Sequence, residues 1–216
     1  MKRLVIFDLD GTLIDTITDL AASTNYALVK NGFQPHETET YRFFVGNGVN
    51  KLFERALPEG EKTDENILRI RKDFLPYYDK YNTDLSRPYP GIPELLEKIQ
   101  SNRILIAVAS NKYQAATEKL ILHYFPRIDF AVVLGQREGV PAKPDPTIVN
   151  EILSVTGIAK KDTIYVGDSG VDMQTAYNSD VESIGVTWGF RPRSELETFN
   201  SKYIVDRAHE IMSLLS

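Results

Sequence analysis

The chain has 216 residues, of which 42% are hydrophobic and 25% are charged, and this composition excludes a disordered chain and favours one large domain or one domain with an insertion. The formal net charge of −5 argues against a protein whose main task is to bind nucleic-acid phosphates. Because the chain has no cysteine, disulfides, thiolate metal sites and cysteine nucleophiles are excluded.

The N-terminal sequence MKRLVIF does not resemble a signal peptide, because its apolar run is short and ends in acidic residues. No stretch of the chain approaches the roughly 18 consecutive apolar residues of a membrane span. We therefore expect a cytoplasmic enzyme or binding protein that acts neither on membranes nor on nucleic acid.

Apolar runs of strand length alternate with helical patterns along the chain. We expect strands at 4–7, 104–109, 130–134, 163–166, 181–186 and 203–205, and helices at 93–100, 114–122, 146–155 and 172–178. The strand runs are continuously apolar, which is typical of parallel strands that are covered on both faces. The predicted fold is α/β, with a Rossmann-like parallel sheet and helices on both faces.

A long helical segment interrupts this alternation after the first strand. Helices are expected from Ile17 to a stop at Asn31-Gly32, and then at 38–44, 49–57 and 64–81, the last interrupted or kinked at Pro76. This insertion of roughly 65 residues is far longer than a crossover between parallel strands requires. We predict a helical cap domain at 16–83 and a core domain made of 1–15 and 84–216.

Polar residues follow three of the predicted strands. Asp8 and Asp10 follow the first, Ser110 and Asn111 the second, and Asp168 the fourth. The carboxyl ends of parallel strands share the edge where open α/β sheets bind ligands. Side chains two residues apart in an extended segment point to the same side, which brings the first two aspartates together.

A further aspartate, Asp172, lies four residues beyond Asp168 in the first turn of a predicted helix. At 4–6 Å, each pair of carboxylates in such a pocket would repel by roughly 3–4 kcal/mol at a dielectric constant of 20, so a cation is needed. Ligation by oxygen alone suits Mg2+, which shares its coordination shell with a substrate phosphate. Lys143, in the loop sequence AKPDPTIV, provides a second positive charge.

Four short motifs occur in a fixed order along the chain: DLDGT at 8–12, SN at 110–111, Lys143 within KPDP, and GDSGVD at 167–172. With these motifs the sequence resembles a haloacid dehalogenase (HAD) superfamily phosphatase. Two further segments, FFVGNGVNKLFERAL and RPYPGIPELL, resemble the phosphoglycolate phosphatases of that superfamily. The resemblance implies a HAD-like fold and Mg2+-dependent hydrolysis of a small phosphate monoester.

The resemblance also implies roles for the four aspartates. Asp8 would be the nucleophile that forms an aspartyl-phosphate, and Asp10 would be the general acid and base. The side chains of Asp8 and Asp168 and the backbone carbonyl of Asp10 would hold Mg2+. Asp172 would support the metal either directly or through water, and the sequence leaves both possibilities open.

By the same resemblance, Ser110 and Lys143 would hold the phosphoryl oxygens, and Lys143 would act in catalysis as a positive charge. Thr12 and the backbone of Asn111 would assist them.

The cap would choose the substrate. The loop Gly46-Asn47-Gly48 is either a simple turn or a loop that faces the substrate. For phosphoglycolate, Arg42, Lys51, Arg55 or backbone amides near Asn47 would receive the small anionic tail.

Other functions remain possible at this point. A phosphomutase resembling β-phosphoglucomutase would use the same Asp8 and Asp10, whereas a phosphonatase would need a cap lysine, for which Lys51 and Lys72 exist. A non-catalytic HAD-like binding protein would be expected to have lost one of the two aspartates. A dinucleotide-binding protein fits poorly, because no G-x-G-x-x-G motif follows the first strand. The sequence determines neither the physiological substrate nor the oligomeric state.

Overall fold

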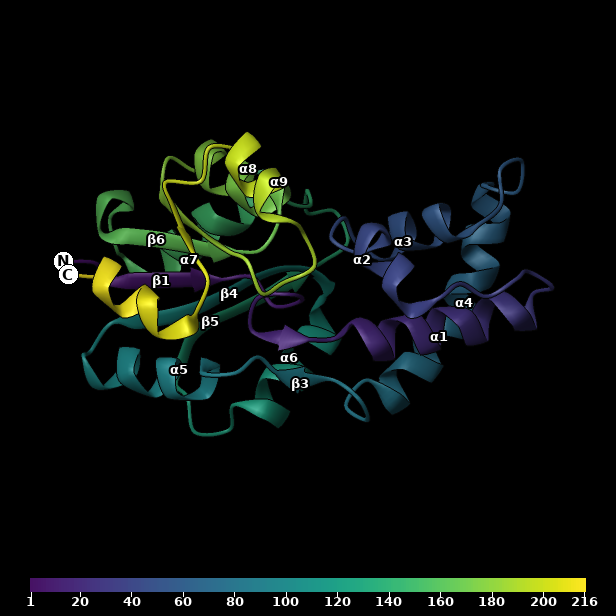
Figure 1. Cartoon of the computed structure of the whole chain (residues 1–216), viewed down its shortest axis with the longest axis horizontal. Coiled ribbons are helices and arrows are strands. Elements are labelled where there is room, and N and C mark those ends of the chain that lie inside the picture. Colours follow the sequence, from purple (N-terminus) through teal and green to yellow (C-terminus); the bar gives the residue numbers. More distant parts are fainter.

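A six-stranded parallel sheet forms the centre of the protein, as described by a computed structural model of all 216 residues (Figure 1). Its strands are β1 (Leu4–Phe7), β4 (Leu105–Tyr113), β5 (Phe130–Gln136), β6 (Thr163–Gly167), β7 (Glu182–Val186) and β8 (Tyr203–Val205). The strand order is β5-β4-β1-β6-β7-β8, and every neighbouring pair is parallel. The predicted α/β fold with a parallel sheet is therefore confirmed.

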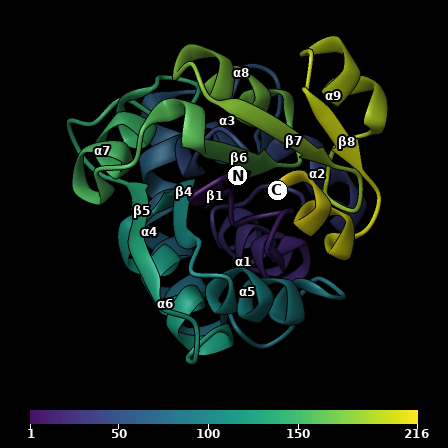
Figure 2. The same cartoon turned by 90° about the vertical axis from the view of Figure 1, so that its left-hand side faces the viewer.

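Helices cover both faces of the sheet (Figure 2). One face is covered by α5 (Ile92–Ser101), α6 (Gln114–Tyr124) and the 3-10 helix η3 (Ala208–Leu214), and the other by α7 (Thr147–Thr156) and α8 (Gly170–Asn178). Along β1, Val5 and Phe7 pack on the first layer, whereas Leu4 and Ile6 pack on the second. Both faces of β1 are fully buried, which explains its continuous apolar sequence.

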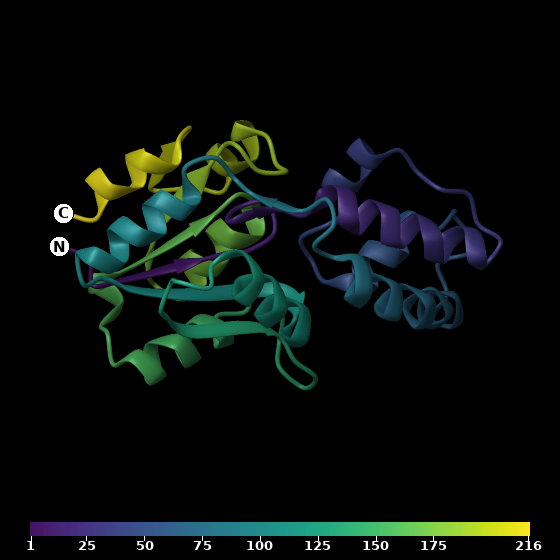
Figure 3. The same ribbon diagram turned by 90° about the horizontal axis from the view of Figure 1, so that it is seen from below.

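A separate group of helices lies beyond the carboxyl ends of the strands, at the end of the molecule opposite to the two termini (Figures 1 and 3). It comprises α1 (Ile17–Lys30), the 3-10 helix η1 (Thr38–Thr40), α2 (Tyr41–Phe44), α3 (Val49–Ala56) and α4 (Asp64–Tyr81). These helices share their own hydrophobic cluster, in which the ring of Phe74 lies 5.0 Å from that of Phe53 and 5.1 Å from that of Tyr78.

Two segments that run side by side connect the helical group to the sheet (Figure 3). They form a short antiparallel ribbon between β2 (Ile14–Asp15) and β3 (Arg87–Pro88). The buried carboxylate of Asp19, in the first turn of α1, accepts hydrogen bonds from the backbone amides of Leu85 and Ser86 and from the Ser86 hydroxyl. Asp19 thereby ties the outgoing and returning segments together.

Several element boundaries differ from those expected from the sequence. Helix α4 is not interrupted at Pro76, because Phe74 and Tyr78 on either side are buried in the helical cluster and hold the helix in place. Strand β4 continues past Ala109 to Tyr113, and the predicted helix at 38–44 is divided into η1 and α2. The sequence did not predict η2 (Lys160–Asp162), η3 or α9 (Arg193–Thr198). None of the helices combines the length and the apolar character needed to cross a membrane.

Candidate active site

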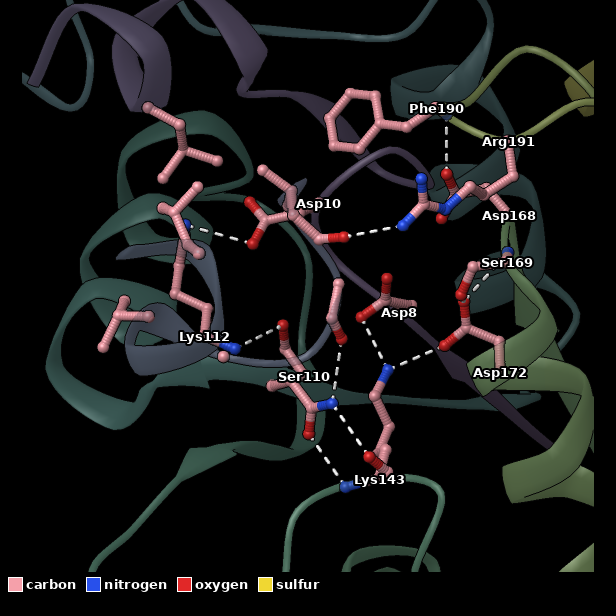
Figure 4. A pocket seen from close by; sticks show the side chains of 17 residues that line it. Asp8, Asp10, Ser110, Lys112, Lys143, Asp168, Ser169, Asp172, Phe190 and Arg191 are labelled. Carbon is pink, nitrogen blue, oxygen red and sulfur yellow. Dashed lines mark hydrogen bonds and ion pairs between the residues drawn. The ribbon is translucent and has the colours of Figure 1, made fainter. Parts of the chain in front are cut away.

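A pocket lies between the carboxyl ends of the strands and the helical group (Figure 4). The sheet side contributes Asp8, Asp10, Ser110, Asn111, Lys112, Lys143, Asp168, Ser169, Asp172, Phe190 and Arg191, and the helical group contributes Leu20, Val45, Gly46, Gly48, Val49 and Leu52. The sheet side is therefore mostly polar and charged, whereas the side chains from the helical group are apolar.

Asp8 and Asp10 are held in place by the end of β1 and the turn that follows it. The backbone amide of Asp8 donates to the Val166 carbonyl, which continues the pairing with β6. Leu9 points away into the hydrophobic core. Gly11 has a φ of 85°, and an added Cβ would lie 2.4 Å from Asp168 Oδ2, so only glycine permits both this turn and this close approach.

Three carboxylates, those of Asp8, Asp168 and Asp172, converge at one side of the pocket. One oxygen of each lies within 4.8 Å of the others, and all three residues are buried. Asp172 lies in the first turn of α8, where it accepts hydrogen bonds from the Ser169 amide and, at 2.6 Å, the Ser169 hydroxyl. The Asp10 side chain is not part of this group.

Lys143 lies among these carboxylates. Its Nζ is 2.8 Å from Asp8 Oδ1, 2.7 Å from Asp172 Oδ1 and 2.9 Å from the Tyr165 hydroxyl. Burial by itself would lower the pKa of the Lys143 ammonium, but the charges of Asp172 and Asp8 outweigh burial and hold this pKa well above its usual range. Lys143 is therefore a permanent positive charge next to Asp8.

The carboxylates carry more negative charge than Lys143 balances. Burial, together with the charge of Asp172, raises the pKa of Asp8 from 3.8 to about 7 against the opposing effect of Lys143. Burial, together with the charges of Asp172 and Asp8, also raises the pKa of Asp168 well above its usual range. Three buried carboxylates with only oxygen donors fit a hard divalent cation such as Mg2+, which would relieve this repulsion.

Asp10 has different partners from Asp8. Its Oδ1 accepts a 2.6 Å hydrogen bond from the Thr16 hydroxyl, and its Oδ2 lies 3.1 Å from Lys112 Nζ. The Lys112 side chain is only 3% exposed. Lys112 was not among the predicted site residues, although its place two residues after Ser110 in an extended segment puts both side chains on the same side.

Of the three remaining residues predicted to bind phosphate, two line the pocket and one does not. Ser110 and Asn111 line the pocket. Asn111 also fixes the loop of Lys143, because its side-chain oxygen accepts from the Lys143 amide and its side-chain nitrogen donates to the Lys143 carbonyl. Thr12 is fully buried and does not line the pocket, and its hydroxyl lies 3.4 Å from Asp168 Oδ1, to which it donates.

In the helical group, Gly46 and Gly48 line the pocket, but Asn47 does not, because its side-chain oxygen accepts a hydrogen bond from Arg55. None of the three cations proposed from the sequence for substrate binding, Arg42, Lys51 and Arg55, lines the pocket. Arg42 pairs with Glu39, and Lys51 pairs with Glu54 at the surface.

Direct contacts hold the helical group against the sheet side. The Arg191 guanidinium donates to the carbonyls of Arg42, at 2.6 Å, and Val45, at 2.9 Å. The Asn111 side chain donates to the Gly46 carbonyl at 3.0 Å. Arg191 was not among the predicted site residues, because its partners lie near it only when the helical group is folded against the sheet side.

Comparison with known proteins identifies the family. Residues 5–186 match the sequence family described as haloacid dehalogenase-like hydrolase. The chain belongs to the haloacid dehalogenase-like hydrolases. The resemblance inferred from the four motifs is thus confirmed, and the four motifs surround the pocket of this hydrolase.

Curated relatives of this haloacid dehalogenase-like hydrolase are named phosphoglycolate phosphatase. The protein from Psychrobacter arcticus is 32% identical over 92% of this chain and 89% of its own length, and the protein from Agrobacterium fabrum is 36% identical over 91% of this chain and 86% of its own length.

Solved structures agree with this family assignment. A crystal structure from Lactobacillus delbrueckii subsp. bulgaricus has a TM-score of 0.93 and 32% identity, and it covers 100% of this chain and 99% of its own. A predicted phosphoglycolate phosphatase from Haemophilus somnus has a TM-score of 0.92 and 26% identity, and it covers 100% of this chain and 98% of its own.

Proposed function

We propose that this haloacid dehalogenase-like hydrolase is a Mg2+-dependent phosphatase that hydrolyses a small phosphate monoester through an aspartyl-phosphate intermediate. The observation that carries the proposal is the position of Asp8, whose carboxylate contacts Lys143 and lies in one cluster with Asp168 and Asp172. This arrangement provides a nucleophile, a fixed cation and a set of carboxylates that suits a divalent metal. The names of the curated relatives support the reaction class.

In the first step, a carboxylate oxygen of Asp8 attacks phosphorus, and the bond between phosphorus and the leaving oxygen breaks. Asp10 is placed to donate a proton to the leaving oxygen, because it lines the same pocket two residues further along the chain. Lys143 and Ser110 bind the phosphoryl oxygens, with the Asn111 backbone beside them. Their fixed positions stabilise the charge that spreads over these oxygens in the transition state.

In the second step, a water molecule attacks phosphorus of the aspartyl-phosphate and releases phosphate. Asp10, now deprotonated, takes the proton from this water, which restores both aspartates. Thr16 and Lys112 hold the two oxygens of the Asp10 carboxylate between the steps, so that the group keeps its orientation.

The side chains of Asp8 and Asp168 and the backbone carbonyl of Asp10 would hold Mg2+, with Asp172 supporting it. When bound, Mg2+ supplies positive charge that stabilises the phosphoryl oxygens and allows Asp8 to stay ionised beside the other carboxylates. Thr12 contributes indirectly, through its hydrogen bond to Asp168.

We further propose that residues 16–83 act as a cap domain on a core domain made of 1–15 and 84–216. The cap supplies the apolar side of the pocket and the glycines of the Gly46-Asn47-Gly48 loop. Its closure over the core excludes water from the reaction and limits the size of the leaving group.

The proposed substrate is 2-phosphoglycolate or a closely similar ester. A panel of phosphate monoesters assayed with and without Mg2+ tests both the reaction and the substrate. We expect phosphate release that depends on Mg2+ and is fastest with 2-phosphoglycolate. Equal rates on many unrelated esters would contradict the substrate assignment, and the absence of any phosphate release would contradict the reaction itself.

A further inference from the structure

Three positively charged side chains, those of Lys143, Arg191 and Lys112, line the pocket. Lys143 is bonded to two carboxylates and a phenol, and Arg191 donates to two backbone carbonyls of the cap. The Nζ of Lys112, by contrast, has one charged neighbour, Asp10 Oδ2 at 3.1 Å. Because an ammonium group carries three N–H donors, Lys112 keeps donors available for another partner.

The removal of the Lys112 ammonium group from water costs free energy that its few contacts do not offset. Its side chain is 3% exposed, and its Nζ lies 4.8 Å from the centre of the Tyr78 ring on α4. Moving a lysine and a carboxylate out of water costs more than a single ion pair usually returns, so such a pair does not by itself favour folding. The position of Lys112 therefore indicates a function in the pocket.

The two lysines of the pocket lie on different sides of the reacting aspartates (Figure 4). Lys143 contacts Asp8, which attacks phosphorus, whereas Lys112 contacts Asp10, which protonates the leaving oxygen. The atoms attached to the leaving oxygen must pass close to Asp10 to reach the cap side of the pocket. They therefore pass within reach of Lys112.

The first turn of α3 lies beside the same place. Gly48, its N-cap residue, lines the pocket, and a Cβ added to Gly48 would lie 3.6 Å from the carbonyl oxygen of Asn111, the residue before Lys112. The first backbone N–H groups of a helix have no partner within the helix, and here no side chain caps them either. These N–H groups favour a negative charge. The cap side chains of the pocket are apolar and offer no competing cation.

We infer that Lys112 is a specificity-determining residue, which binds a carboxylate on the leaving group of the substrate with the help of the first turn of α3. The inference rests on the proposed phosphatase function and defines its substrate class as short phosphate monoesters whose leaving alcohol carries a carboxylate. The cation that selects the substrate then comes from the core, at the end of β4, and not from the cap.

The test compares two esters of nearly equal size, 2-phosphoglycolate and 2-hydroxyethyl phosphate, in which a neutral hydroxymethyl group replaces the carboxylate. For the wild-type protein with Mg2+, we expect kcat/KM to be at least about tenfold higher for 2-phosphoglycolate than for 2-hydroxyethyl phosphate. This factor corresponds to the contribution of one hydrogen bond to a charged group. Lys112→Met should reduce this preference by roughly ten- to hundredfold. The matched control, Lys98→Met, removes an exposed lysine of α5 that does not line this pocket.

The ratio of the two kcat/KM values separates recognition from a role through Asp10. If Lys112 only positions Asp10, Lys112→Met lowers the rates for both esters by the same factor, and this outcome would overturn the inference. Equal kcat/KM values for the two esters with the wild-type protein would also overturn the inference. This comparison needs no variant, so it does not depend on whether Lys112→Met folds. A wild-type protein that hydrolyses both esters equally leaves the proposed phosphatase function intact, whereas one that hydrolyses no ester refutes that function and the inference with it.

Discussion

Lys143 Nζ lies 2.8 Å from Asp8 Oδ1, and both side chains are almost completely removed from solvent. The two residues are separated by 135 positions in the sequence and come together only because β1 and the loop before α7 meet at one edge of the sheet. The pair places a fixed positive charge next to the proposed nucleophile. It does not neutralise the site, because Asp168 and Asp172 remain close by.

Replacement of the nucleophile is the most direct test of the mechanism. Asp8→Asn should lower Mg2+-dependent phosphatase activity at least about 1,000-fold, because an amide does not form the acyl-phosphate. Phosphate release is the measurement, and circular dichroism should show an unchanged fold. Asp129→Asn, which removes an exposed carboxylate, should be fully active. Survival of activity in Asp8→Asn would rule out the aspartyl-phosphate route.

Replacement of the general acid should depend on the leaving group. Asp10→Asn should reduce kcat/KM for an alkyl phosphate by roughly 10²–10⁴-fold, the usual contribution of general acid catalysis. With p-nitrophenyl phosphate the reduction in the phosphoryl-transfer step should be much smaller, because its leaving oxygen needs no proton. Single-turnover kinetics separates this step from hydrolysis of the intermediate. The same loss for both substrates in that step would show that Asp10 is not the acid.

The metal-free protein should become less stable as the pH rises. The pKa of Asp8 is about 7 in the folded protein, compared with 3.8 for an ordinary aspartate. At a pH between these two values, the carboxyl of Asp8 keeps its proton in the folded state and has lost it in the unfolded state. The contribution of Asp8 to stability is therefore lost as the pH rises from about 4 to about 7, and it does not change above that window. Asp8→Asn removes this contribution but keeps that of Asp168, whose pKa is also raised by burial.

Thermal unfolding in EDTA at pH 5 and pH 8 measures this effect. The Tm of Asp8→Asn, relative to that of the wild type, should be higher at pH 8 than at pH 5. Added Mg2+ should raise the Tm of the wild type more than that of Asp8→Asn. A Tm difference that does not change with pH would contradict the assignment of a raised pKa to Asp8.

The contact between Arg191 and the cap should contribute to substrate binding. Arg191→Met removes two hydrogen bonds to cap carbonyls, and we expect KM to rise roughly tenfold or more because the cap closes less readily. Arg193→Met is the matched control, because Arg193 pairs with Asp206 at the surface. A KM equal to that of the control would exclude a role of this contact in closure.

The connection between the sheet and the group of helices α1–α4 depends on Asp19. Asp19→Ala leaves the amides of Leu85 and Ser86 without their acceptor, which should cost roughly 2–4 kcal/mol of the free energy of unfolding. Urea unfolding measures this change. Glu65→Ala, which removes an exposed carboxylate of α4, should change the stability by less than about 0.5 kcal/mol. A similarly small change for Asp19→Ala would mean that the ribbon alone holds the connection.

Local sequence was a good guide where local physics decides the structure. The apolar runs predicted all six strands of the sheet, and for the central strand β1 the reason is burial on both faces, which leaves no place for polar side chains. Helix α4 shows the limit of this approach. Its local sequence predicts an interruption or a kink at Pro76, and burial of Phe74 and Tyr78 keeps the helix free of an interruption.

For the site, the sequence by itself determined the positions of Asp8 and Asp168, because each directly follows a strand and parallel strands end at one edge, and it placed Asp10 two residues beyond Asp8. Only the tertiary structure revealed the pairing of Lys112 with Asp10 and the contacts of Arg191 with the cap. A lysine looks the same in sequence whether it is solvated or buried. Its role depends on charges and packing that distant segments bring to it, and these exist only once the sheet and the group of helices α1–α4 are folded together.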